Sequence, residues 1–169
     1  MDLRIVKTKN VIKDAFLKLR KKNPLEKIKI TELCNIALIN KATFYKHYLD
    51  VYELSDELEN GIVSAIIDNA ENINSLFTDP QGFVTGLFSA VAVHKNTVDL
   101  LFGGRINILV SKIEERLKSI YTSNDDSPER AVTLSFYIGG TAHLMINSKY
   151  DPDLIIGVLT NIISSSKKP

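Results

Sequence analysis

The chain has 169 residues, of which 44% are hydrophobic and 24% charged, and its formal net charge is +1. These proportions are typical of a folded globular protein and exclude an intrinsically disordered one. The single cysteine excludes an intramolecular disulfide framework, and the charged first ten residues do not resemble a secretory signal peptide. We therefore expect a cytoplasmic protein.

The charges are distributed unevenly along the chain. Residues 1–50 contain 12 Lys or Arg and 5 Asp or Glu, whereas the other 119 residues contain 9 and 15. The first part therefore has a net charge of +7 and the second part a net charge of −6. A basic segment of this kind favours a polyanionic partner, although lysines that only solvate an exposed helix face would produce the same counts.

The first half of the chain shows apolar residues at helical spacing. In the first segment these residues are Ile12, Ala15, Phe16 and Leu19. The segment ends at Asn23-Pro24, because the residue before a proline disfavours helix. Thr31 and Asn40 are placed to cap two further short helices. In the second of these, Phe44 and Tyr48 are four residues apart and are expected on the buried side.

The second half also predicts helices. Asp50 and Glu53 have the spacing of a capping box, which predicts the start of a long helix that runs to about Ile73. Later helices are predicted to begin where a capping residue precedes a proline, at Asp79-Pro80, Ser127-Pro128 and Asp151-Pro152. Residues 105–121 predict a charged amphipathic helix. Residues 131–148 lack formal charge but contain too many polar side chains for a membrane span, so they predict a buried central helix.

No segment alternates as strands do, and the chain is predicted to be all-helical, with about eight or nine helices. The two short helices joined by "LIN" form a helix-turn-helix pattern. In the sequence "NKATFYKHY", residues 41, 42 and 45 share one face of a helix, opposite Phe44 and Tyr48. A recognition helix that enters the major groove of DNA is arranged in this way.

The segment "TELCNIALINKATFYKHYLDVYEL" resembles the DNA-binding head of the tetracycline-repressor (TetR) family of transcription regulators. The resemblance covers about residues 8–58 and rests on the order of Thr43, Phe44, Tyr45, His47 and Tyr48. It implies an all-α fold with a three-helix DNA-binding head, residues 1–50. A helical body, residues 51–169, would sense a ligand and form a dimer.

The resemblance also implies roles for residues of the head. The bases would be contacted by Lys41, Ala42 and Tyr45. The phosphates would be contacted by Thr31, Thr43, Lys46, His47 and Tyr52. The alternative for Tyr45 and His47 is an ordinary surface role, which for His47 includes helix capping.

The chain departs from the family at two positions. Many members have glycine where this chain has Leu38, so Leu38 either adopts a left-handed conformation or the chain turns differently. Many members also have a lysine where this chain has Val51, and that lysine contacts a DNA phosphate. In this chain the Tyr52 hydroxyl is the candidate replacement for it.

Two apolar segments near the end, residues 131–148 and the last helix, predict a twofold homodimer in which the subunits form a four-helix bundle. The alternative is that both helices pack entirely within one subunit. The candidate interface residues are Gly139, Gly140, Ala142, Ile155, Val158, Leu159 and Ile162.

The middle helices carry candidate residues for a ligand pocket. These residues are Phe83, Phe88, His94, Phe102, Phe136, Tyr137 and His143. For each of them taken alone, an ordinary core position is the simpler interpretation. The effector is expected to be a small molecule or, alternatively, a partner protein.

No catalytic residue, metal site or cofactor is expected. The three histidines do not have metal-ligand spacing with one another or with Cys34. The chain lacks a glycine-rich phosphate loop after a strand and a G-x-S-x-G motif. Cys34 lies in a short apolar run, where a small buried residue is a simpler interpretation than a nucleophile.

These patterns and the resemblance together predict a homodimeric, sequence-specific transcription regulator of the TetR type. Most members of that family are repressors. It is expected to bind a palindromic double-stranded DNA operator and to respond to a ligand. No association with a membrane is expected. The alternative is an all-helical module whose basic head binds RNA or an acidic protein. This alternative explains the charge distribution but not the order "KATFYKHY" after a capped short helix. A helical enzyme with a buried apolar pocket is a third alternative.

Overall fold

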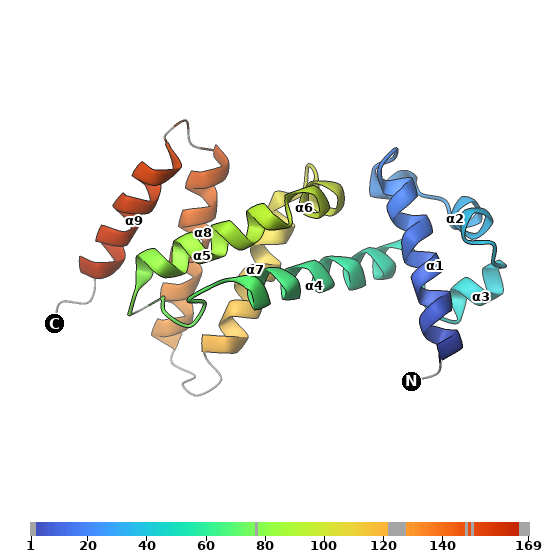
Figure 1. The fold of residues 1–169 in the computed structure, drawn as a ribbon, viewed down its shortest axis with the longest axis horizontal. Coiled ribbons are helices and arrows are strands. Elements are labelled where there is room, and N and C mark those ends of the chain that lie inside the picture. Colours follow the sequence, from blue (N-terminus) through green and yellow to red (C-terminus); the bar gives the residue numbers. More distant parts are fainter. Residues whose placement is uncertain (1–2, 77, 122–127, 148, 150, 166–169) are drawn as a thin grey trace. The chain divides into compact units, whose positions relative to one another are not determined.

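The structure is a computed structural model that describes residues 3–76, 78–121, 128–147, 149 and 151–165. Within these ranges the fold is all-α, with nine α-helices, one short 3-10 helix and no strand (Figure 1). The chain divides into two compact units. The head unit comprises Met1–Gly61 and Asn96–Gly103, and the body unit comprises Ile62–Lys95 and Gly104–Pro169. The predicted all-helical class is confirmed, and the head unit extends beyond the predicted boundary at residue 50.

The head unit is built around the first helices of the chain. Its elements are α1 (Leu3–Arg20), a 3-10 turn (Leu25–Lys27), α2 (Ile30–Ala37), α3 (Lys41–Tyr45) and the first part of α4 (Val51–Asn69). Helix α2 packs against α1, and α3 packs against α2. The apolar residues predicted for the first helix face are all buried, as are Phe44 and Tyr48.

Helix α6 (Lys95–Phe102) contributes most of its residues to the head unit. Its connection to α1 is polar. The Arg20 guanidinium donates hydrogen bonds to the carbonyl oxygens of Leu100 (2.8 Å) and Leu101 (3.2 Å), and to that of Asn23 (2.9 Å). The last carbonyls of a helix lack partners within the helix, and a cation is favourable at that end. Arg20 therefore attaches the end of α1 to the end of α6.

Two helices of the head unit begin with the predicted caps. The Asn40 side-chain oxygen accepts hydrogen bonds from the backbone N–H of Thr43 (2.7 Å) and from its hydroxyl (3.0 Å). At the start of α4, the Asp50 carboxylate accepts from the backbone N–H groups of Tyr52 and Glu53, at 2.8 and 2.9 Å. The Glu53 carboxylate accepts from the N–H of Leu49, which completes a capping box shifted by one residue.

The cap predicted for α2 is wrong. This helix begins at Ile30, and the residue at its N-cap position is Lys29, which makes no side-chain capping bond. Thr31 lies inside the first turn instead, where its side chain is exposed. The helix is held instead by its apolar side, on which Leu33 and Cys34 are buried.

The body unit contains the second part of α4 and four further helices. These are α5 (Pro80–Val93), α7 (Ile106–Tyr121), α8 (Pro128–Asn147) and α9 (Pro152–Ser165). Helix α8 packs against α7 and α9, and α5 packs against α9. Across the described residues, no helix combines the length and the apolar character needed to cross a bilayer.

The starts of α5 and α9 agree with the predicted capping residues. The Asp79 carboxylate accepts from the N–H of Gly82 (3.0 Å), and the Asp151 carboxylate accepts from that of Asp153 (2.9 Å). Helix α8 begins at Pro128 as predicted, while Ser127 lies outside the described residues. Both visible caps join residues two or three positions apart, which is why the local sequence was sufficient to predict them.

Helix α8 is not buried on all sides, contrary to the prediction for residues 131–148. Leu134, Tyr137 and Ile138 are buried, whereas Val132 and Phe136 are each 69% exposed. The difference follows from the helical period, because residues four apart share a face and these two lie away from the buried side. The exposed side of α8 is therefore an apolar surface of the body unit.

Candidate nucleic-acid interface and apolar cavity

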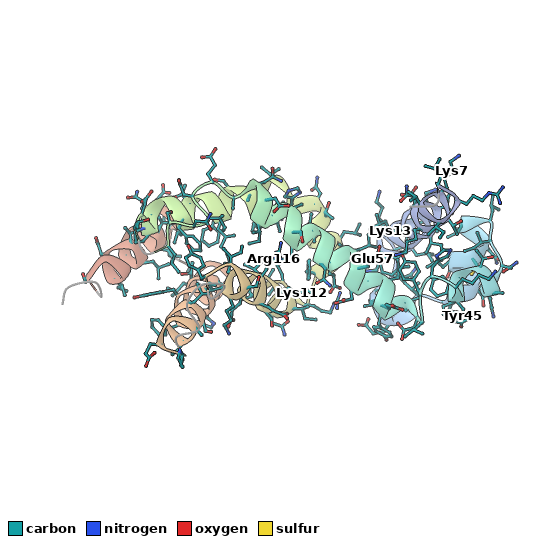
Figure 2. All side chains as sticks on the ribbon, turned by 90° about the horizontal axis from the view of Figure 1, so that it is seen from below. Lys7, Lys13, Tyr45, Glu57, Lys112 and Arg116 are labelled. Carbon is teal, nitrogen blue, oxygen red and sulfur yellow. The ribbon has the colours of Figure 1, made fainter. Side chains whose placement is uncertain are left out.

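Helix α3 is two-sided, with a buried anchor and an exposed polar side. Phe44 is completely buried, whereas its neighbour Tyr45 is 54% exposed and projects from the surface of the helix (Figure 2). Lys41, Ala42 and Lys46 are also exposed. The predicted base-contacting residues therefore lie together on the solvent side of α3.

Aromatic contacts hold the buried side of α3. The ring of Phe44 lies 5.8 Å from that of Tyr48 and 5.6 Å from that of Tyr45, in an edge-to-face arrangement with Tyr45. Lys9 lies over the Tyr48 ring, with its ammonium 5.1 Å from the ring centroid. Such aromatic and cation–π pairs add to the stabilisation from burial alone. The short α3 is thus fixed by packing as well as by its Asn40 cap.

Glu57 of α4 neutralises two lysines of α1. Its carboxylate oxygens lie 2.8 Å from Lys9 Nζ and 2.7 Å from Lys13 Nζ, and Figure 2 shows Lys13 beside Glu57. Burial alone would raise the pKa of Glu57, but the hydrogen bonds and charges of Lys13 and Lys9 outweigh it and lower the pKa to about 2. Glu57 is therefore ionised at physiological pH, and part of the positive charge of the head is compensated internally.

The predicted phosphate-contacting residues differ in their availability. Tyr52 is exposed, and so are Thr31 and Lys46, whereas His47 is half-buried. The Thr43 hydroxyl donates its only hydrogen to Asn40. A phosphate oxygen is an acceptor, so a phosphate contact by Thr43 requires this hydroxyl to exchange its partner. Val51, the residue before Tyr52, is buried.

Leu38, between α2 and α3, has a left-handed backbone conformation with φ 55°. Of the two alternatives expected for Leu38, the left-handed turn is the one observed, a conformation that glycine adopts without cost. Leu38 is 90% exposed, so its side chain contributes little packing in return.

Replacing Leu38 by glycine should therefore stabilise the head. The left-handed strain is relieved, while the greater freedom of glycine in the unfolded chain offsets part of the gain, leaving about 0.5–1 kcal/mol. Equilibrium denaturation of the full chain measures this change. Leu49→Gly is the matched control, because Leu49 is also exposed but has no positive φ, and this variant should lose stability. Equal effects of the two substitutions would contradict the strain at Leu38.

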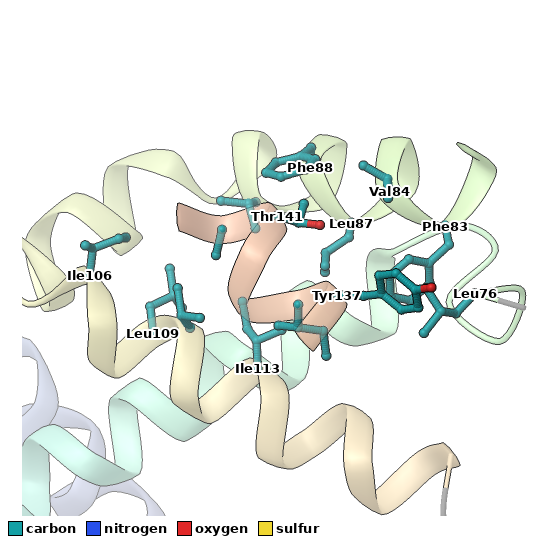
Figure 3. Close-up of a pocket in the computed structure, with 14 residues that line it drawn as sticks. Leu76, Phe83, Val84, Leu87, Phe88, Ile106, Leu109, Ile113, Tyr137 and Thr141 are labelled. Atoms are coloured by element: carbon teal, nitrogen blue, oxygen red, sulfur yellow. The ribbon is translucent and has the colours of Figure 1, made fainter. Parts of the chain in front are cut away.

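The body unit contains an apolar cavity of about 120 Å³ between α5, α7 and α8 (Figure 3). All lining residues are uncharged, and only Tyr137 and Thr141 carry a side-chain hydroxyl. The remaining lining residues are Leu76, Phe83, Val84, Leu87, Phe88, Val91, Ile106, Leu109, Val110, Ile113, Ile138 and Ala142.

Three of the predicted pocket residues, Phe83, Phe88 and Tyr137, line this cavity. The other four do not. Phe102 is buried in the head unit, and Phe136 is exposed. His143 is exposed as well, and His94 ends α5, with its Nε2 3.4 Å from Asn69 Nδ2. The prediction selected aromatic and histidine residues, whereas most of the cavity wall is aliphatic. The sequence does not distinguish an aliphatic residue that lines a cavity from one that fills a core.

The exposed sides of α8 and α9, two helices that pack against each other, carry large apolar residues. We call these residues together the apolar face: Val132, Phe136, Leu144, Leu154, Val158 and Ile162. Gly139, Gly140 and Gly157 leave open space, since a Cβ added to any of them meets no atom of the described structure. Among the predicted interface residues, Val158, Ile162 and the two α8 glycines agree with this face.

The other predicted interface residues lie elsewhere. Ile155 and Leu159 are buried within the body unit, and Ala142 lines the cavity. The prediction chose the wrong side of α9: residues 154, 158 and 162 form an exposed stripe at four-residue spacing, while Ile155 and Leu159 face the core.

In the described ranges, no three His, Cys, Asp or Glu side chains converge as metal ligands.

No protein-family model matches the chain, and a search of curated proteins finds no significant match.

Proposed function

We propose that the protein is a sequence-specific, DNA-binding transcription regulator of the TetR type, acting as a homodimer, and that it is a repressor released by a ligand. The observation that carries the proposal is the two-sided α3. Phe44 and the Asn40 cap hold this helix in place, while Lys41, Tyr45 and Lys46 are exposed on it. Such a helix can place side chains at base edges in the major groove, with flanking donors on phosphates.

The apolar face of α8 and α9 supports the homodimer. Large apolar residues that are exposed on two helices packed against each other favour an interaction surface. In a twofold dimer the same face of each copy supplies both sides of the interface, so no other partner is required. The open space at Gly139, Gly140 and Gly157 allows a second pair of helices to approach closely. A dimer presents two copies of α3, which predicts a palindromic operator with half-sites one helical turn or its multiples apart.

Selection of bound duplexes from a random DNA pool, followed by sequencing, tests the proposal. The expected result is an enriched palindrome at physiological salt. Uniform capture that depends only on salt would contradict a sequence-specific regulator, and would favour the module that binds RNA or an acidic protein through its basic head. A single asymmetric half-site would contradict the dimer.

Lys46→Ala tests the phosphate contact next to α3. The substitution should weaken binding to all DNA sequences alike and reduce the slope of log affinity against log salt by about 0.9. Fluorescence anisotropy with one selected and one unrelated duplex, over a series of salt concentrations, measures this. Lys112→Ala in α7 is the control, because it makes the same change in net charge in the body unit. An unchanged slope for Lys46→Ala would remove Lys46 from the phosphate contacts.

A further inference from the structure

The cavity in the body unit has a wall that excludes charged ligands. Twelve of its fourteen lining residues are apolar, and the other two, Tyr137 and Thr141, offer only neutral hydroxyl groups. A charged group that enters such a site loses its hydration without gaining an ionic partner, and this cost is large. A ligand that fits the wall is therefore neutral and mainly apolar.

The size of the cavity restricts the ligand further. Its volume is about 120 Å³. In another protein, an engineered cavity of about 150 Å³ with an aliphatic and aromatic wall stays dry and binds benzene. A compact molecule of about one ring is therefore the class that matches this volume.

Contacts outside the cavity hold its walls in position. The Tyr121 hydroxyl of α7 donates to the Ile73 carbonyl (2.7 Å) and accepts from the N–H of Leu76 (2.9 Å), which itself lines the cavity. On α5, a Cβ at Gly86 would collide with the carbonyl oxygen of Glu71, so glycine allows a close contact there. Interiors of proteins are normally close-packed. These contacts are made by the protein itself and do not depend on the cavity being filled.

One wall of the cavity is also part of the apolar face. Tyr137, Ile138 and Thr141 of α8 line the cavity, and Figure 3 shows Tyr137 and Thr141 there. Val132 and Phe136 of the same helix are exposed. A ligand that favours one position of α8 therefore favours one arrangement of the surface that pairs two copies. If the dimer surface has two arrangements that differ in DNA affinity, a ligand shifts the protein toward the arrangement that it binds more tightly. The size of the resulting change in DNA affinity is limited by the ratio of the ligand's affinities for the two arrangements.

We propose that this cavity binds a compact, uncharged, apolar molecule of about one ring, and that binding acts through α8 on the dimer surface. The second half rests on the proposed function, because it requires a dimer that binds an operator. The first half concerns the cavity alone.

Ligand-observed NMR on the full chain, without DNA, tests the first half. The probes are toluene, benzoate and benzylammonium, which share one ring and differ in charge. Toluene should bind, and each charged probe should bind at least tenfold more weakly. Equal binding of benzoate or benzylammonium, or no binding of toluene at millimolar concentration, would overturn the assignment.

Cavity-filling variants locate the binding site. Ala142→Leu places a larger side chain in the wall and should weaken toluene binding at least tenfold. Ala92→Leu is the matched control on the exposed side of α5, where toluene binding should be unchanged. Val84→Phe fills the cavity from α5 and provides the same test if Ala142→Leu fails to fold. Undiminished toluene binding by a folded filled variant would overturn the assignment.

The regulatory half is tested with a selected duplex. Toluene should change the affinity for the duplex at least fivefold in the unsubstituted protein and not in Ala142→Leu. Toluene binding without any change in duplex affinity would overturn this half and leave the cavity assignment intact. Absence of any selected duplex would instead contradict the proposed function, while the NMR measurement without DNA still decides the ligand class.

Discussion

Replacing Phe44 by alanine is expected to lower the stability of the head unit by about 3–5 kcal/mol, the usual cost of truncating a buried aromatic residue. Phe44 is completely buried and contacts the rings of Tyr45 and Tyr48. Its loss removes the anchor of α3, so selective DNA binding should disappear as well. Hydrogen exchange of the amides in residues 30–48 measures the local opening free energy, and anisotropy with a selected duplex measures binding.

Tyr45→Ala is the matched comparison, because it truncates the neighbouring aromatic residue on the exposed side. Its effect on stability should stay within about 0.5 kcal/mol, as is usual for a surface position. The preference at one base pair should change by about 1–3 kcal/mol. Destabilisation equal to that of Phe44→Ala would contradict the two-sided arrangement of α3. Unaltered base preferences would show that Tyr45 does not read bases.

Replacing Arg20 by methionine is expected to destabilise the head unit by about 2–4 kcal/mol. The substitution keeps a long side chain but removes the hydrogen bonds to the carbonyls of Asn23, Leu100 and Leu101. A hydrogen bond from a charged group contributes about 1.5–3 kcal/mol to the free energy of unfolding. Water that reaches the carbonyl oxygens in the variant restores part of this loss. Hydrogen exchange should show faster opening of α6 amides together with those at the end of α1.

Two further variants define the role of Arg20. Arg20→Lys keeps the charge, but a single ammonium group cannot reproduce the planar fork of a guanidinium, so only part of the stability should return. Lys21→Met removes a charge from the adjacent exposed residue and should have little effect. Unchanged exchange in α6 after Arg20→Met would show that the packing of Val98, Leu101 and Phe102 alone holds this helix.

Short-range features were predictable from the sequence alone. The caps at Asn40, Asp50, Asp79 and Asp151 join residues that are close in the chain. The two sides of α3 follow from the helical period, which puts Phe44 and Tyr45 on different faces. Thr31 was wrongly predicted as a cap, because capping by a threonine depends on where the helix begins, and α2 begins one residue before it, at Ile30.

Which side of a helix is buried, and against which distant part of the chain, was decided by the tertiary structure. The sequence shows two apolar sides on α9, at residues 154, 158, 162 and at Ile155, Leu159, but not which of them is exposed. The attachment of Arg20 to α6 joins residues 80 positions apart, and no local pattern indicates it. The cavity is the space that α5, α7 and α8 leave between them, so its aliphatic wall cannot be distinguished in the sequence from an ordinary core. Local hydrogen bonding and helical periodicity are properties of short segments, whereas burial depends on which segments pack together.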